Sequence, residues 1–414
     1  MIDYSHFELA NGLKVIVHQD KATRLAAMNL LYDVGSRDED QDKTGFAHLF
    51  EHLMFGGSRN IDNYDEPLQK VGGENNAFTT PDITNYYLTV PSINLETGFW
   101  LESDRMLSLS FNPTVLEVQR KVVIEEFKQR YLNQPYGDTW LKLRPLAYKT
   151  HPYQWATIGK EISHIENASM HDVREFFFKF YRPNNAILVV AGNVETDAVK
   201  RLCEKYFGPI PVGEKYERKL PEEQSQKEER YMEIEADVPL NAFNKAFHMP
   251  ARNHPDYHST DLLCDLLGQG NSSRLFDQLV KKKKLFNSIT SFVTGSMDPG
   301  LFGINGKLNE GVSLEDADSA FWEVIEILKG EGVSTKELGK VKNQAHTSVE
   351  FGEVELLNRA MNLALATLRG NSELVNLEKE IIDKVATTDI HRLANEILTK
   401  SNCSTLYYKS KSVA

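Results

Sequence analysis

The sequence predicts a two-domain protein in which each domain combines helices and strands. Its 414 residues exceed one ordinary domain and fit two domains of about 200 residues each. One order of elements, a strand, a polar stretch and a helix that ends at glycines, occurs in both halves. The charge-dense stretch between the halves has the composition of an exposed linker. We therefore expect residues 1–212 to form the first domain, 213–230 the linker and 231–414 the second domain.

The chain begins with segments that favour strands. Phe7–Gln19 alternates around Asn11-Gly12, a dipeptide that favours a hairpin turn, and Leu13–His18 is predicted to be a strand. Ala27–Val34 is predicted to be a second strand, and a polar loop follows it.

The next element is a helix with an unusual polar stripe. Phe46–Phe55 is apolar except for three residues, and Gly56-Gly57 is a natural end for it. At 100° per residue the three polar side chains, His48, Glu51 and His52, fall within one arc of about 100°. Burying them without partners costs several kcal/mol, so a compensating group is expected. Two histidines four residues apart with a glutamate between them form the inverted zinc motif His-x-x-Glu-His.

A third protein ligand is expected elsewhere in the chain, because catalytic zinc takes three and keeps one position for water. The predicted helix Pro113–Leu132 offers Glu117, Glu125 and Glu126. On a helical plot Glu126 falls inside the apolar arc, whereas Glu125 lies outside it among lysines. A carboxylate directed into a core needs a cation. Glu126 is therefore the predicted third ligand, with Glu125 as the competing assignment.

The rest of the first half contributes a hairpin and further elements. Gly72-Gly73 precedes two predicted strands, Glu74–Thr80 and Thr84–Val90. His171–Phe180 is predicted to be a helix, and a strand follows over Ala186–Val190.

The second half repeats the early pattern without its metal residues. Asn244–Met249 is strand-like, and a helix over Ser259–Leu267 ends at Gly268–Arg274. The matching helix carries leucines, so we expect a duplicated domain whose second copy has lost the metal residues.

Charge and cysteine content exclude several classes of function. Lys and Arg number 47 and Asp and Glu 59, a net charge of −12, which argues against binding to nucleic acid or an anionic membrane. The one basic block, Lys281–Lys284, is most simply a solvated face, and a contact with an acidic partner is the alternative. Cys203, Cys264 and Cys403 are widely spaced, so neither a disulfide framework nor a thiolate metal site is expected.

The start of the chain predicts the location. It lacks the basic start and the apolar core of a signal peptide, and no apolar run approaches the roughly 20 residues that span a bilayer. A cytoplasmic protein is expected; a periplasmic one would require a signal peptide removed before this numbering begins.

Several motifs together resemble one family. They are His48-Leu-Phe-Glu-His52 with the distant Glu126, Asn76-Ala-Phe-Thr79 after a Gly-Gly pair, Tyr181-x-Pro-x-Asn185, and Gly268–Phe276 in the second half. The combination resembles the pitrilysin-type inverted-zincin metallopeptidases, the family of insulin-degrading enzyme and mitochondrial processing peptidase. The resemblance covers nearly the whole chain.

This resemblance implies a fold, a cofactor and a reaction. The fold would be α+β, with two similar domains that are each an antiparallel sheet packed with helices. One Zn²⁺ per chain would be held by His48, His52 and Glu126. Glu51 would be the general base of a zinc-dependent endopeptidase. Asn76 and Ala77 would lie on an edge strand that pairs with the backbone of a peptide substrate; an ordinary hairpin is the alternative.

The chain departs from the family pattern at two places. Gln119 stands where many relatives have a second glutamate that supports the ligand. The arginine and tyrosine with which active members bind substrate are absent, because Val280 and Asn287 occupy those positions, and Arg274 is assigned a structural role. We therefore expect a homologous partner subunit in a heterodimer to supply the missing pair; a homodimer is the alternative assembly.

A non-catalytic assembly subunit is the rival interpretation, since the family also contains scaffold members. Those members typically degrade the metal motif. The motif is intact here, which favours the enzyme.

Overall fold

The chain folds into two units that each contain one β-sheet. A computed structural model describes residues 1–411. Unit 1 comprises Met1–Phe127, Trp155–Leu220 and Glu350–Leu377. Unit 2 comprises Lys128–Gln154, Pro221–Val349 and the described residues from Glu378 onward.

Unit 1 is built on a six-stranded sheet with the order β1-β2-β6-β3-β5-β4. Neighbours are antiparallel except β2 and β6, which are parallel. The predicted turn at Gly12 is confirmed, since β1 pairs with β2 across it and Gly12 has a φ of +85°. The strands are β1 (Ser5–Glu8), β2 (Lys14–Gln19), β3 (Leu25–Tyr32), β4 (Glu74–Thr79), β5 (Thr84–Pro91) and β6 (Ala186–Gly192).

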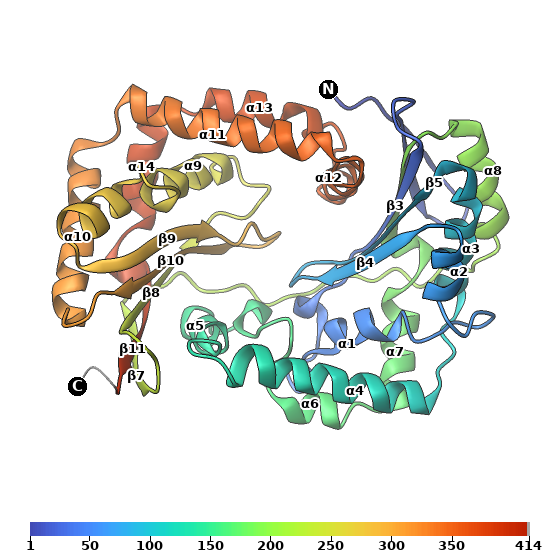
Figure 1. Ribbon diagram of the computed structural model, residues 1–414, viewed down its shortest axis with the longest axis horizontal. Helices are drawn as coiled ribbons and strands as arrows, with labels where there is room; N and C mark the ends of the chain where they lie inside the picture. Colours follow the sequence, from blue (N-terminus) through green and yellow to red (C-terminus); the bar gives the residue numbers. More distant parts are fainter. Residues whose placement is uncertain (412–414) are drawn as a thin grey trace. The chain divides into compact units, whose positions relative to one another are not determined.

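Helices cover both faces of this sheet (Figure 1). The helices of unit 1 are α1 (Phe46–Leu53), α2 (Asp65–Lys70), α3 (Leu95–Leu107), α4 (Pro113–Phe127), α6 (Ile162–Glu166), α7 (Met170–Phe180), α8 (Thr196–Tyr206) and α12 (Leu356–Leu368). Of these, α4 packs on α1 and α6 packs on α4. Short 3₁₀ turns connect them at η1 (Ser36–Asp38), η2 (Ser92–Asn94) and η5 (Pro183–Asn185).

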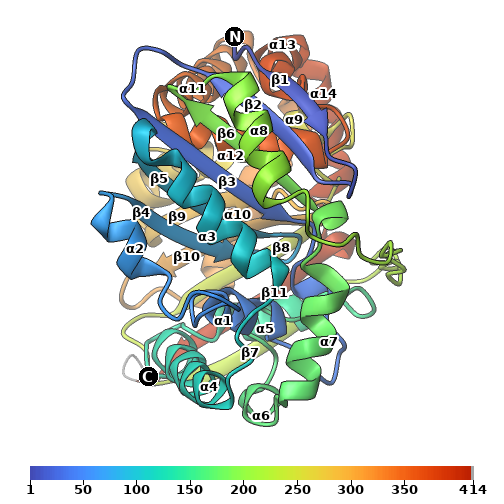
Figure 2. The same cartoon turned by 90° about the vertical axis from the view of Figure 1, so that its right-hand side faces the viewer.

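The central strand β3 shows why both faces need cover. Successive side chains of a strand point to opposite faces, and in β3 every residue after Leu25 is buried. Met28 faces α3, where its sulfur lies close to Gly98. Leu31 belongs instead to the cluster that α12 completes with Leu363. Figure 2 shows α3 and α8 in front of the sheet and α12 behind it.

Unit 2 is built on a five-stranded sheet with the order β7-β11-β8-β10-β9. Here β7 and β11 are the parallel pair and the other neighbours are antiparallel. The strands are β7 (Arg230–Ala236), β8 (Ala242–Met249), β9 (Phe286–Val293), β10 (Gly300–Leu308) and β11 (Cys403–Ser410).

The helices of unit 2 also lie on both faces of their sheet. Phe243 and Phe247 of β8 join the core formed with α9, α10 and α14. Ala242 and Ala246, on the other face of the same strand, pack with Leu143 of α5. The α-helices are α5 (Thr139–Ala147), α9 (Tyr257–Gly268), α10 (Leu314–Glu331) and α14 (Thr387–Ile397). Two π-helical segments, η3 (Lys128–Leu132) and η6 (Phe276–Lys282), and two 3₁₀ turns, η4 (Pro152–Gln154) and η7 (Lys400–Asn402), accompany them.

The two sheets repeat one topology. The order β2-β6-β3-β5-β4 of unit 1 corresponds to β7-β11-β8-β10-β9 of unit 2, with the parallel pair at the same place. Helix α1 follows β3 as α9 follows β8. The predicted α+β fold with two similar domains is confirmed. Each sheet was expected to be antiparallel throughout, but each contains one parallel pair of strands.

The units exchange helices. Helix α5 comes from the first half of the chain and packs on β7, β8 and β11, whereas α12 comes from the second half and packs on β2, β3 and β6. The division by contacts therefore differs from the contiguous ranges 1–212, 213–230 and 231–414. The reason is that each sheet has a second apolar face, and the helix that covers it comes from the other half. The helices α11 (Thr335–Val354) and α13 (Leu374–Lys384) run across the resulting boundaries.

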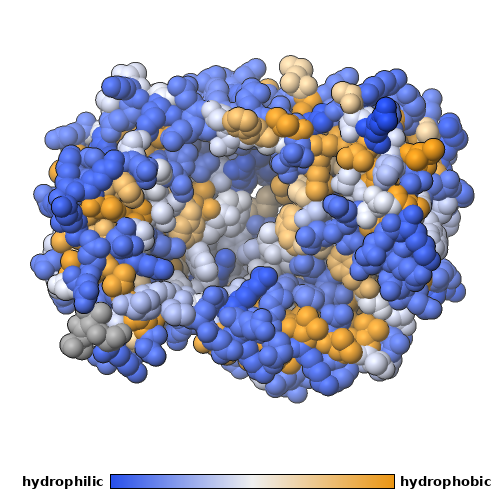
Figure 3. All heavy atoms as spheres, in the orientation of Figure 1, coloured by the Kyte–Doolittle hydropathy of each residue, from blue (hydrophilic) through white to orange (hydrophobic). Residues whose placement is uncertain are grey.

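The surface agrees with the acidic composition. On the face drawn in Figure 3, hydrophilic residues predominate and hydrophobic ones form separate patches.

Among residues 1–411, no helix combines the length and the apolar character needed to cross a membrane. The three cysteines are free and buried.

Candidate metal centre and active site

Helix α1 is positioned by a tight turn and an apolar face. Gly45 precedes it with a φ of +86°, and a side chain there would collide with the backbone of Ile158. Five apolar residues of the helix are buried: Phe46, Ala47, Leu49, Phe50 and Leu53. The helix packs against α4, β4 and β5. The remaining arc carries the three polar side chains, as the sequence predicts.

Three metal-ligating side chains converge beside this helix. The Nε2 atoms of His48 and His52 lie 3.7 and 3.5 Å from Oε2 of Glu126. The side chains are 13%, 24% and 19% exposed. Two ligands that are each about 2.0–2.1 Å from a tetrahedral ion lie about 3.4 Å apart. The spacing of these donors therefore fits one ion with an open, solvent-facing side.

Helix α4 presents Glu126 to the histidines. Leu116, Val123 and Phe127 are its buried residues, and they fix the face that α4 turns toward α1. Glu126 lies at the edge of this face and joins the histidine cluster, whereas Glu125 is exposed. The structure thus brings together the three residues of the preferred assignment and leaves the competing one outside.

Glu51 is held by a residue of the neighbouring strand. Its Oε2 accepts a hydrogen bond of 2.6 Å from Oγ1 of Thr79 on β4. A hydrogen bond from a hydroxyl restricts the rotamer of the carboxylate that accepts it. Thr79 belongs to the Asn76-Ala-Phe-Thr79 motif, but the motif alone predicted no role for it. Side chains alternate along a strand, so Ala77 and Thr79 of β4 point to the same side. This alternation is the sequence signal that could have placed Thr79 near the site.

Two buried tyrosines lie beneath the helix. Tyr181 stacks on Phe50 with ring centroids 5.2 Å apart, and its hydroxyl lies 3.1 Å from that of Tyr86. Burial raises the pKa of both phenols well above the ordinary value, and the charge of Glu51 adds to the rise. Both tyrosines therefore stay neutral and form an unreactive wall behind the general-base candidate.

A buried ion pair supports the same region. The guanidinium of Arg105, 1% exposed, donates to both carboxylate oxygens of Glu102. It also lies over the rings of Phe55, Tyr64 and Tyr86, at 5.2, 4.6 and 4.4 Å from their centroids. The charge thus sits in an aromatic cage that includes the residue two positions after α1. Arg105 was not among the residues predicted from the sequence.

The predicted substrate strand is at the edge of its sheet. Within residues 1–411, strand β4 pairs with β5 alone, and Asn76 is exposed on it. The N–H of Ala77 donates to Oδ1 of Asn76 at 2.8 Å. A neighbouring side chain thus occupies a donor that an added strand would use.

The positions of the family departures are also clear. Gln119 lies half-buried on α4, two turns before Glu126. Val280 packs against the core of unit 2, and Asn287 is exposed on β9. Arg274 donates to Glu337, which agrees with a structural role.

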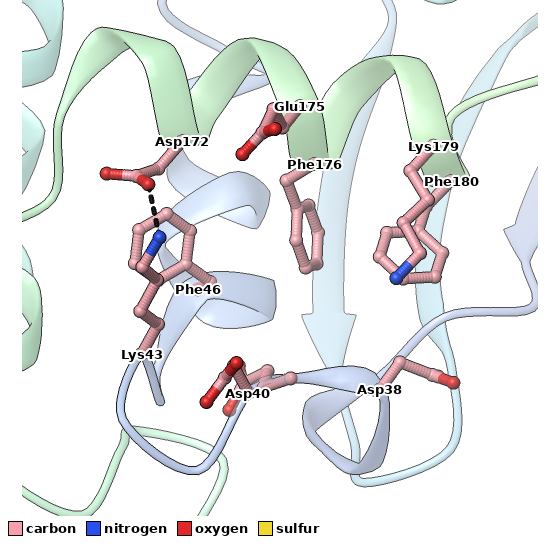
Figure 4. Close-up of a pocket in the computed structure, with 10 residues that line it drawn as sticks. Asp38, Asp40, Lys43, Phe46, Asp172, Glu175, Phe176, Lys179 and Phe180 are labelled. Carbon is pink, nitrogen blue, oxygen red and sulfur yellow. Dashed lines mark hydrogen bonds and ion pairs between the residues drawn. The ribbon is translucent and has the colours of Figure 1, made fainter. Parts of the chain in front are cut away.

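A separate pocket of about 440 Å³ lies at the start of α1, away from the metal-ligating cluster. Figure 4 shows it between α7 and the loop that follows η1, with the ion pair of Lys43 and Asp172 at 2.6 Å on one side. Burial would raise the pKa of Asp172, but Lys43 and Ser169 lower it to about 2. Asp40 and Glu175 also line this pocket.

Comparisons with known proteins agree on one family. The family described as Insulinase (Peptidase family M16) matches residues 14–142, and the Peptidase M16 inactive domain matches residues 167–345. The zinc protease PqqE of Helicobacter pylori is 31% identical over 412 residues, which cover 97% of this chain and 91% of that protein. The mitochondrial-processing peptidase subunit beta of Blastocladiella emersonii is 25% identical, with 94% and 85% covered. The crystal structure of a protease from Helicobacter pylori matches with a TM-score of 0.92 at 29% identity and covers 99% of this chain and all of that one.

Proposed function

Because the chain belongs to the M16 peptidase family, we propose that it is a zinc metalloendopeptidase that hydrolyses peptide bonds with Glu51 as general base. The observation that carries the proposal is the intact donor set of His48, His52 and Glu126, with Glu51 on the same face of α1. The Helicobacter pylori relative, which is named a zinc protease, supports the choice of metal.

The residues divide the chemistry between them. A zinc ion held by the three donors would lower the pKa of a water to about 7 and polarise the scissile carbonyl. Glu51, oriented by Thr79, accepts the proton of the attacking water and delivers it to the leaving amine. The neutral tyrosines behind it exclude bulk water from that side.

Substrate would bind as an added strand. The free edge of β4 offers backbone donors and acceptors to an extended peptide, and this mode depends little on side chains. The hydrogen bond from Ala77 to the Asn76 side chain must then open, so the amide of Asn76 becomes available to the peptide.

A homologous partner subunit would complete the substrate site. Neither Val280 nor Asn287 can bind a peptide carbonyl as an arginine or a tyrosine does. Peptide digests with and without co-purified proteins test this part. Equal rates in both digests would contradict it.

Two neighbouring glutamates allow a matched test of the metal centre. Glu126→Ala should lose zinc, whereas Glu125→Ala, one residue away on the same helix, should keep about one zinc per chain. Glu51→Gln should keep zinc and lose peptide hydrolysis. Metal content is measured by mass spectrometry after growth in zinc-replete medium.

The second candidate is a non-catalytic assembly subunit, which the missing arginine and tyrosine favour. A metal-free wild-type protein from zinc-replete medium would support that role. Hydrolysis by Glu51→Gln at the wild-type rate would remove Glu51 as the base.

A further inference from the structure

Helix α1 begins without a capping side chain of its own. Its N-cap residue is Gly45, so the first turn lacks the serine, threonine or aspartate that usually accepts an orphan amide. The carboxylate of Glu39, which lies upstream in the loop, takes this place. Its Oε2 accepts from the N–H of Gly45 at 2.9 Å, and its Oε1 from the N–H of Ala47 at 2.8 Å.

Both oxygens of Glu39 are thus used on one helix terminus. The residue is 8% exposed, and Ala47 directly precedes the candidate ligand His48. In its carboxylate form, Glu39 also places a negative charge at the positive end of the helix dipole. These two hydrogen bonds therefore restrain the position of the first turn of α1, and with it the backbone of His48.

The loop that carries Glu39 is itself anchored at three points. Trp155 donates to the carbonyl oxygen of Ser36 at 2.9 Å. Arg218 donates to both carboxylate oxygens of Asp38, at 2.7 and 3.1 Å, and the Asp38 side chain is fully buried. Lys43 pairs with Asp172 of α7, as Figure 4 shows.

Arg218 anchors the loop directly beside Glu39, because the residue that it binds, Asp38, precedes Glu39 in the sequence. Arg218 comes from an unexpected part of the chain. It lies in the stretch predicted to be an exposed linker, yet its side chain is only 21% exposed. It also donates to Asp33 at 2.9 Å. The guanidinium of Arg218 donates to two carboxylates at once, and a lysine, which offers a single point charge, cannot reproduce this arrangement.

We propose that Glu39 is a positioning residue for the metal-ligating helix and that Arg218, through Asp38, holds Glu39 in place. The segment that joins the two halves thereby contributes to the geometry of the candidate metal centre without touching it. The part of this proposal that concerns zinc rests on the proposed function; the part that concerns the helix does not.

The test compares Glu39→Gln with a matched helix-capping variant in unit 2. Glu337 accepts from the N–H of Ser334 at the start of α11 and also pairs with Arg274, so Glu337→Gln removes a helix-capping carboxylate without approaching α1. Burial raises the pKa of Glu39 to about 8, against the two amides that lower it. The comparison is therefore run above pH 8, where the carboxylate form dominates.

Two measurements are made on the full-length chain. Competition with a chelator should give a zinc affinity roughly tenfold weaker for Glu39→Gln and unchanged for Glu337→Gln, because groups that support ligands typically contribute this much. Hydrogen exchange of metal-free protein, followed in peptides that cover residues 44–49, should accelerate in Glu39→Gln only.

Arg218→Lys provides a milder second variant in case Glu39→Gln does not fold. It should weaken zinc binding in the same direction by a smaller factor. The double variant should be no weaker than Glu39→Gln alone, because both changes act through one contact.

The outcomes are distinct. Unchanged exchange and zinc affinity in Glu39→Gln, or an equal loss of zinc in Glu337→Gln, would overturn the positioning role. Additive losses in the double variant would overturn the link to Arg218. If wild-type protein binds no zinc, the proposed function fails, and the exchange of residues 44–49 still decides whether Glu39 holds the helix.

Discussion

The buried pair of Arg105 and Glu102 should be destabilising when broken and nearly dispensable when removed whole. Arg105→Met leaves the Glu102 carboxylate, 1% exposed, without its cation. It also removes the contacts with the three aromatic rings. Leaving an uncompensated buried charge costs about 3–5 kcal/mol.

The magnitude for the double variant follows from the same contacts. In Glu102→Leu with Arg105→Met no charge stays buried, and two apolar side chains fill the aromatic cage. The remaining cost is the hydroxyl of Tyr64, which loses its 2.5 Å bond to Glu102 and is left unsatisfied at about 1–3 kcal/mol. The double variant should therefore be more stable than Arg105→Met alone.

The assay must report on unit 1, because a single unfolding signal from two units does not give a well-defined free energy. Urea unfolding followed by hydrogen exchange in peptides of α3 and β5 meets this need. Lys70→Met, which breaks the exposed pair of Lys70 and Glu66, is the control and should leave the midpoint unchanged. A double variant as unstable as the sum of its single changes would refute the reasoning.

Three further predictions concern other contacts. Thr79→Val should keep zinc and lower kcat about tenfold with little change in KM, because the lost bond of about 1.4 kcal/mol orients the base; an unchanged kcat in a peptide-cleavage assay would contradict this. Leu363→Ala should destabilise unit 1 by about 2–5 kcal/mol although it lies in the second half of the sequence, and exchange data that change only in unit 2 would contradict it. The bond from Arg274 lowers the pKa of Glu337 to about 2, so its contribution, about 1 kcal/mol after allowance for solvent screening, should be present above pH 4.5 and be lost as the pH falls toward 2. Thermal melts of Glu337→Gln should therefore approach those of wild type near pH 2, and a constant difference across this range would be the contrary result.

Local periodicity predicted the parts of the site that lie on single helices. The stripe on α1 and the inward side of α4 follow from 100° per residue, and the structure brings Glu126 rather than Glu125 to the histidines. The hairpin of β4 and β5 and the repeat of β8 with α9 were predicted from alternation and turn residues in the same way. These features depend on neighbours in sequence, which a pattern can report.

Contacts between distant segments were not predictable in this manner. Glu39, Arg105 and Arg218 are ordinary charged residues in polar stretches, and only the fold gives them buried partners. The helices α5 and α12 have apolar faces, but such a face does not identify the sheet that it covers. The predicted domains 1–212 and 231–414 are contiguous for this reason: the sequence does not show that α5 and α12 each pack on the sheet of the other half.

The exchange of α5 and α12 has a consequence for biosynthesis. Strand β6 completes the sheet of unit 1 at Gly192, yet Ile16, Leu31 and Val189 on its second face stay open until α12 has emerged from the ribosome. Helix α5, made early, must wait for β8 and for β11 near the end of the chain. A nascent chain therefore exposes apolar surface of unit 1 until α12 has been made and of unit 2 until β11 has been made, and chaperones can bind such surface in the meantime.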